Sequence, residues 1–134
     1  MNTVTVNRVR DRMNESCKID SIEDLDVFKL SHELTVEIYK ITKTFPKEEI
    51  YGLTSQLRRA ASSVTSNLAE GTNRNTRSEY RHFVGIAKGS AGEVHYQLLL
   101  AKDLGYVDIE KCSSLRDGYR RVLQMLQKLF KSLS

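Results

Sequence analysis

The sequence predicts an all-α protein that folds as an antiparallel, up-down-up-down four-helix bundle and assembles into an oligomer. A chain of 134 residues is long enough for one domain and too short for two. One proline and seven glycines are too few for the many turns of a β-sandwich or barrel. Apolar residues recur at three- and four-residue steps in four segments, and the short connections between these segments favour antiparallel neighbours.

Residues 1–23 show no sustained helical period, and we expect them to form a flexible N-terminal arm outside the bundle of residues 24–134. The first helix is predicted over residues 25–45. It must stop before Pro46, because the proline ring disfavours helical geometry in the residue that precedes it. Its apolar repeat reads Val27, Leu30, Leu34, Ile38, Ile41 and Phe45.

The second helix is predicted over residues 48–70. Glu48 and Glu49 suit the first turn of a helix, where the helix dipole favours negative charge. Gly71 is the expected C-cap, since glycine adopts the left-handed conformation that ends many helices. The apolar repeat of this helix reads Ile50, Leu53, Leu57, Ala60, Val64 and Leu68.

The third and fourth helices are predicted over residues 77–104 and 109–132. Thr76 and Glu79 form a capping-box pattern at the start of the third helix, and Gly105 ends it. Asp108 is the expected N-cap of the fourth helix. The two apolar repeats read Tyr80, Val84, Ala87, Ala91, Val94, Leu98 and Ala101, then Cys112, Leu115, Tyr119, Val122, Leu126, Leu129 and Leu133.

Three glycines lie inside the third helix, where each costs about 1 kcal/mol of helix propensity relative to alanine. Gly85, Gly89 and Gly92 share one helical face, a spacing that lets another helix approach closely. The second helix offers a matching set of small residues. We therefore expect tight packing of this glycine face against Ala60, Ala61, Ser62, Ser63 and Ser66.

The fourth helix carries a second apolar register beside the first, so its apolar surface is wider than one intramolecular seam needs. We expect the additional surface to face another subunit. The predicted oligomer interface consists of Tyr119, Leu123, Leu126 and Phe130.

The formal net charge of +4 is unevenly distributed, because all of the excess positive charge lies in the second half of the chain. Basic residues form stripes at the start of the third helix and on the polar side of the fourth. Such stripes suit nucleic-acid phosphates, although a solvated helix face explains them nearly as well. The candidate nucleic-acid-binding residues are Arg74, Arg77, Arg81, Lys88, Arg120, Arg121 and Lys128.

The spacing of the candidate catalytic and metal-binding residues does not match the motifs that such sites require. His32-Glu33 begins like a zinc-protease helix motif, but Val36 stands where the second imidazole should be. His82 and His95 are more than three helical turns apart, too far to share a metal. Cys17 and Cys112 form no CxxC pair. We therefore expect no enzymatic activity, no metal and no cofactor.

The sequence contains no stretch of 18 apolar residues, which a membrane-spanning helix would need. Its first residues alternate polar and charged side chains where a signal peptide would be apolar. A cytoplasmic protein without a membrane partner is expected.

Two blocks carry a family resemblance: Ser66-Asn67-Leu68-Ala69-Glu70-Gly71, preceded by Ser63, and Ile86-Ala87-Lys88-Gly89-Ser90 with Glu93. With them, residues 24 to 130 resemble the four-helix-bundle proteins encoded in intervening sequences of bacterial 23S ribosomal RNA genes, also called S23-like. The resemblance extends to the accessory variability proteins of diversity-generating retroelements, which implies a basic homopentamer that binds nucleic acid. Phe28 stands where the family often has Trp, and Val94-His95-Tyr96 replaces a more usual Leu-x-Thr.

Together these observations predict a non-catalytic oligomer, a pentamer by resemblance, that binds RNA or DNA non-specifically through its basic stripes. The alternative is a structural or adaptor oligomer that docks a protein partner without binding nucleic acid. Salt dependence separates the two, because phosphate binding weakens steeply with ionic strength whereas apolar docking need not.

Overall fold

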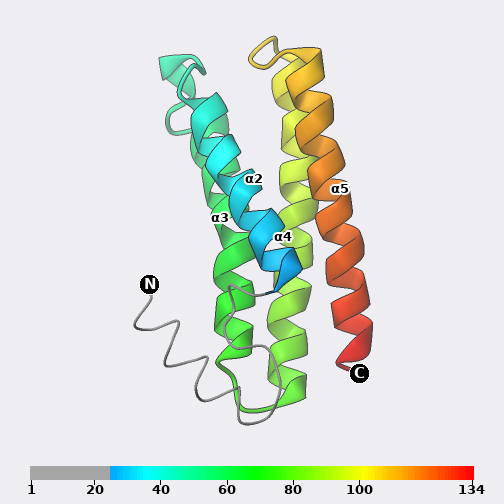
Figure 1. Ribbon diagram of the computed structural model, residues 1–134. Helices are drawn as coiled ribbons and strands as arrows, with labels where there is room; N and C mark the ends of the chain where they lie inside the picture. The colour runs from blue at the N-terminus through cyan, green and yellow to red at the C-terminus, as the bar shows by residue number, and fades with distance from the viewer. Residues whose placement is uncertain (1–24) are drawn as a thin grey trace.

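The structure is a computed structural model that describes residues 25–134; the expected arm at residues 1–23 lies outside the described residues. Within them the fold is all-α, with four long helices, one short 3-10 helix and no strand, which confirms the predicted class (Figure 1). The elements are α2 (Asp26–Thr42), η2 (Lys47–Glu49), α3 (Leu53–Thr72), α4 (Arg77–Asp103) and α5 (Ile109–Ser132).

Helices that follow one another in the sequence lie side by side (Figure 1). The most extensive contact joins α3 to α4, followed by the contact of α4 with α5. The first helix, α2, packs against both α3 and α5. The four helices therefore surround one core, to which each contributes its apolar side. Its largest fully buried side chains are Tyr119, Ile38, Leu57, Leu68, Leu98 and Leu126.

Local side-chain chemistry sets the ends of α4 and α5. The Thr76 hydroxyl accepts a hydrogen bond from the backbone N–H of Glu79 at 3.0 Å, and the Asp108 carboxylate accepts one from the N–H of Lys111 at 2.7 Å. Both expected N-caps are confirmed. After α4 the chain turns at Gly105, whose φ of 82° lies in the region that favours glycine. This conformation agrees with the predicted role of Gly105 in ending the helix.

The first helix is shorter than predicted, because α2 ends at Thr42 rather than Phe45. From there the N–H of Phe45 donates to the Thr42 carbonyl at 3.2 Å, so the chain tightens into turns of i→i+3 type. The tighter winding carries the Phe45 ring into the core, where its centroid lies 5.3 Å from that of Tyr106.

The predicted start of the second helix is also wrong, since residues 47–49 form η2 and α3 begins at Leu53. Glu49 lies outside the helix and caps it: its carboxylate accepts the Leu53 N–H at 2.9 Å. At the other end, Gly71 is inside α3 and not its C-cap. A Cβ there would lie 2.8 Å from the Tyr80 ring, so this glycine allows α3 and α4 to approach closely.

The expected packing of the α4 glycines against α3 is wrong. A Cβ on Gly89 or Gly92 would meet nothing within 4 Å, so these two face open space. The contact with α3 uses another side of α4, where the Ser63 and Ser90 hydroxyls lie 2.8 Å apart. A close approach of this kind occurs instead at Gly118 of α5. A Cβ added there would lie 2.7 Å from Leu34 Cδ2 of α2.

The two kinds of glycine predict opposite effects of adding a methyl group. Gly118→Ala should lower the free energy of unfolding by about 1 kcal/mol or more, because Leu34 is buried and must move. Gly89→Ala should raise it by up to about 1 kcal/mol, through helix propensity alone. Urea unfolding of both variants measures this, and effects of the same sign would contradict the assignment.

Candidate nucleic-acid interface

The predicted basic residues of α4 meet α5 around one aromatic ring. The guanidinium carbon of Arg81 lies 3.8 Å from the centroid of the Phe130 ring, and Lys88 Nζ lies 5.0 Å from it. Arg77 donates a hydrogen bond to the backbone carbonyl of Ser132 at 2.5 Å, two residues beyond Phe130 along α5. We call Arg77, Arg81, Lys88 and Phe130 the Phe130 cluster.

Helical spacing explains why these residues come together. Arg77, Arg81 and Lys88 occupy one side of α4, the side that faces α5. Between them lies Gly85, where a Cβ would be 3.4 Å from Phe130 Cε1, so the missing side chain leaves room for the ring. Lys88 also donates to the Gln127 side chain, one turn before Phe130.

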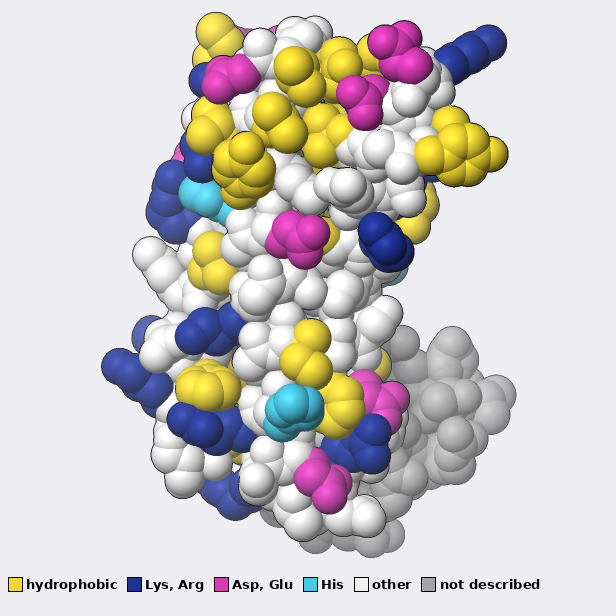
Figure 2. Space-filling model, turned by 180° about the vertical axis from the view of Figure 1, so that it is seen from behind, with side chains coloured by type: hydrophobic (Ala, Val, Ile, Leu, Met, Phe, Trp, Pro, Cys, Tyr) yellow, Lys and Arg dark blue, Asp and Glu magenta, His cyan; other side chains and the backbone are white. Residues whose placement is uncertain are grey.

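The cluster carries positive charge that no nearby carboxylate of the described residues balances. Among residues 25–134, no carboxylate lies within ion-pair distance of Arg77, Arg81 or Lys88. Arg121 and Lys128 are exposed on α5 and are likewise unpaired within that range. Figure 2 shows Lys and Arg side chains gathered in the lower part of the molecule, where α4 begins and α5 ends. A phosphate would meet several cations on this surface that no carboxylate of residues 25–134 pairs with.

Two of the seven predicted binding residues are placed differently. Arg74 pairs with Glu70 at 2.8 Å, and its guanidinium lies 4.7 Å from the Phe83 ring. The predicted stripe at the start of the third helix is wrong at Arg74, because this residue precedes the N-cap of α4 and helical spacing does not apply to it. Arg120 pairs with Asp117 at 2.6 Å. Carboxylates therefore offset both charges.

The predicted oligomer interface needs a correction at Tyr119 and Leu126. Both side chains are fully buried in the core of their own chain, so they have no surface left for another subunit. The apolar surface of α5 is wide because α5 packs against both α2 and α4. Leu123 and Phe130 are partly exposed and stay available for contact.

A second polar contact joins α4 and α5, and it is not among the contacts predicted from the sequence. Arg116 Nε donates to the backbone carbonyl of His95 at 2.9 Å, and its Nη2 lies 3.4 Å from His95 Nδ1. A signal was present in the seven-residue steps from Arg81 to Lys88 to His95, which place three nitrogen-bearing side chains on the side of α4 that faces α5.

Burial and neighbouring charge shift several pKa values. Burial is the main cause that lowers the pKa of His95, and the cations of Arg116 and Arg120 lower it further. Burial raises the pKa of the Cys112 thiol and of the Tyr119 hydroxyl. Cys112 therefore stays a neutral thiol, with its Sγ 3.4 Å from the Leu98 carbonyl oxygen.

Within the described part of the chain, no three His, Cys, Asp or Glu side chains come together as a metal site would require. None of the helices in residues 25–134 combines the length and the apolar character needed to cross a membrane.

The lowered pKa of His95 predicts a pH dependence of stability. Between the folded pKa and the unfolded value of about 6.5, the unfolded chain binds the proton that the folded protein releases, so stability falls as the pH drops through this window. Glu37, whose pKa Lys111 lowers, acts in a separate window below its ordinary value of 4.5.

His95→Gln should flatten the dependence of the urea midpoint on pH between about 7 and 5.5. The control is His82→Gln, the same change on an exposed side of α4. If both variants keep the wild-type slope, the half-buried imidazole contributes nothing to it.

A comparison with known families identifies the class of protein to which this chain belongs. Residues 23–128 match the family described as 23S rRNA-intervening sequence protein, and the chain belongs to this family. Its predicted membership is thus confirmed, whereas the relation to accessory variability proteins stays a prediction.

A solved structure supports the fold. It is the crystal structure of a protein with unknown function from the S23 ribosomal protein family of Bacteroides thetaiotaomicron VPI-5482. The TM-score is 0.73 at 23% sequence identity, and the match covers 78% of this chain and 98% of that one. At this identity the likeness concerns the fold alone. No curated protein matches the chain.

Proposed function

We propose that this protein is a non-catalytic, cytoplasmic RNA- or DNA-binding oligomer, built from antiparallel up-down-up-down bundles, that contacts phosphates through the Phe130 cluster. The observation that carries the proposal is the set of three cations held at the seam of α4 and α5 without a neighbouring carboxylate among residues 25–134. Membership in a family named for a ribosomal RNA intervening sequence agrees with such a ligand.

The geometry of the cluster suits backbone binding without base recognition. Cations that neutralise phosphates release condensed counterions, which makes the affinity strongly dependent on salt and independent of sequence. The contact of Arg81 with the Phe130 ring orients its guanidinium before a ligand arrives. Arg121 and Lys128, exposed on the adjacent part of α5, extend the same positive surface.

Removing two cluster cations should weaken binding to RNA and duplex DNA about equally. Arg77→Gln/Lys88→Gln should lower the slope of log affinity against log salt by roughly one unit for each lost phosphate contact. Fluorescence anisotropy across a salt series measures both effects. The control double variant, Lys29→Gln/Lys43→Gln, removes the same charge from exposed positions on and just after α2.

The control should bind as tightly as the wild type. An equal loss in both double variants would mean that net charge, and not the Phe130 cluster, determines affinity. Wild-type protein that binds neither nucleic acid at low salt would remove the proposed function.

We further propose that the chain forms a homo-oligomer, a pentamer as the family resemblance implies, in which Leu123 contributes to the contact. Leu123→Glu should reduce the sedimentation coefficient, because a charge at an apolar contact is strongly unfavourable. Gln124→Glu, one residue further on an exposed side of α5, should leave it unchanged. A monomeric wild type at micromolar concentration would contradict the assembly.

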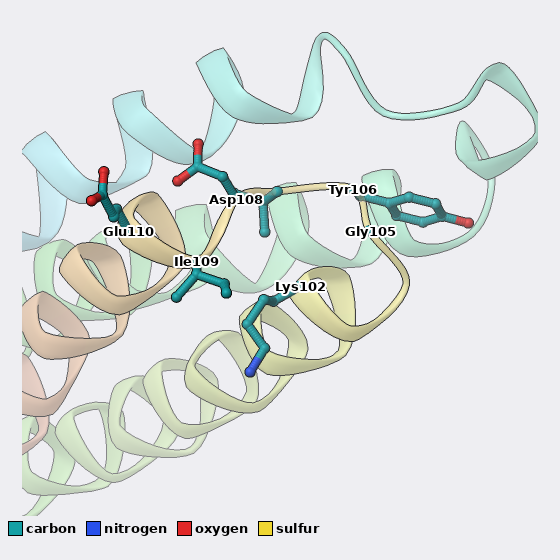
Figure 3. Close-up of a pocket in the computed structure, with 7 residues that line it drawn as sticks. Lys102, Gly105, Tyr106, Asp108, Ile109 and Glu110 are labelled. Atoms are coloured by element: carbon teal, nitrogen blue, oxygen red, sulfur yellow. The ribbon is translucent and has the colours of Figure 1, made fainter.

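A different observation supports the adaptor alternative. Large apolar side chains are exposed at the end of the molecule opposite the Phe130 cluster, with Tyr51 at 95% and Ile109 at 73% exposure. Ile109 lines an open pocket with Lys102 and Tyr106 at the connection of α4 to α5 (Figure 3). A protein partner docked here would bind with little dependence on salt, so the salt series also tests this alternative.

A further inference from the structure

A hollow of about 220 Å³ lies between α4 and α5, away from the Phe130 cluster. Lys102 of α4 and four residues of α5 contribute the polar groups of its wall: Ser113, Arg116, Asp117 and Arg120. Arg116 precedes Gln127, the α5 partner of Lys88, by 11 residues, which is roughly 16 Å along a helix. The hollow is therefore a separate place on the surface.

Arg116 is held in position before any ligand arrives. Its Nε donates to the His95 carbonyl and its Nη2 lies near His95 Nδ1, so one side of the guanidinium is fixed against α4. The Nη1 group donates no hydrogen bond within residues 25–134 and remains available. A fixed arginine with free N–H groups suits the oxygen atoms of a phosphate, which accept paired hydrogen bonds.

The charge balance of the hollow is positive. Arg116 has no carboxylate within ion-pair distance among the described residues. Asp117 pairs with Arg120 at 2.6 Å, and Asp103 lies 3.4 Å from Lys102 but is largely exposed. The floor adds no negative charge, because burial raises the pKa of the Cys112 thiol and keeps it protonated.

We propose that this hollow binds one phosphate group, with Arg116 as the fixed donor and the Ser113 hydroxyl as a further hydrogen-bonding group. Lys102 and Arg120 flank the site, each paired with a carboxylate, at Asp103 and Asp117. The phosphate could come from a free phosphate or phosphate ester, or from the backbone of a bound nucleic acid. In the second case the inference rests on the proposed function. The chemistry recognised is the same in both cases.

His95 provides a readout that does not depend on nucleic acid. Arg116 and Arg120 lower the pKa of this imidazole, whereas Asp117 raises it. A dianion beside the two arginines would offset their effect and raise the pKa of His95. Protein with ¹³C-labelled histidine is titrated with inorganic phosphate at constant ionic strength. We expect a saturable shift of the His95 signal and a higher pKa, with no saturable shift at His32 or His82.

Variants at Arg116 test the geometry. Arg116→Gln should weaken phosphate binding at least tenfold, and Arg116→Lys, which keeps the charge and loses the fork of N–H groups, should weaken it nearly as much. The matched control Arg59→Gln removes the same charge from an exposed position on α3, outside the hollow, and should leave binding unchanged. Thermal unfolding checks that each variant is folded.

A linear, non-saturating response at His95, or equal binding by wild type and Arg116→Gln, would overturn the site. Competition identifies the source of the phosphate. If single-stranded RNA displaces phosphate from the wild type and not from Arg77→Gln/Lys88→Gln, the site holds a backbone phosphate. If RNA binds without displacing phosphate, the site takes a free phosphate. A saturable shift of the His95 signal with phosphate, in a protein that binds no RNA, would contradict the proposed function and support this site.

Discussion

Helix α4 packs against α3 with one side and against α5 with another, and much of the rest of the structure depends on this arrangement. Its side toward α3 carries small residues such as Ser90, whose hydroxyl meets Ser63 at 2.8 Å. Its side toward α5 carries Arg81, Lys88 and His95, whose polar atoms reach groups of α5. Because long basic side chains lie along this seam, their charges emerge between two helices instead of on a free helix face.

Short-range chemistry made several features predictable from sequence. Thr76, Asp108 and Gly105 act within a few residues of their own position, so local pattern sufficed to place these helix ends. Periodicity identified the apolar residues of each helix but not which neighbour covers them. For that reason the periodicity predicts Tyr119 and Leu126 at a subunit contact, although α2 and α4 already enclose their helix. It also predicts Gly89 against α3, although this glycine faces open space.

Prediction from sequence has the same limit for the basic residues, because their tertiary neighbours are not encoded in spacing along one helix. Carboxylates three or four positions away pair with Arg120 and Arg74, a local effect that sequence spacing can anticipate. The grouping of the Phe130 cluster, whose cations have no carboxylate partner among residues 25–134, depends on how α4 meets α5. Spacing along one helix does not contain that information. Local pairing thus removes Arg74 and Arg120 from the seven candidates, and the contact of α4 with α5 brings Arg81 and Lys88 together at Phe130.

Ultraviolet cross-linking of the protein to single-stranded RNA, followed by mass spectrometry of the peptides, tests most directly whether this seam binds nucleic acid. Cross-links should concentrate in residues 77–88 and 121–131, which carry the cluster and the exposed cations beside it. Cross-links confined to α2, or to the apolar end around Tyr51, would contradict the proposed interface.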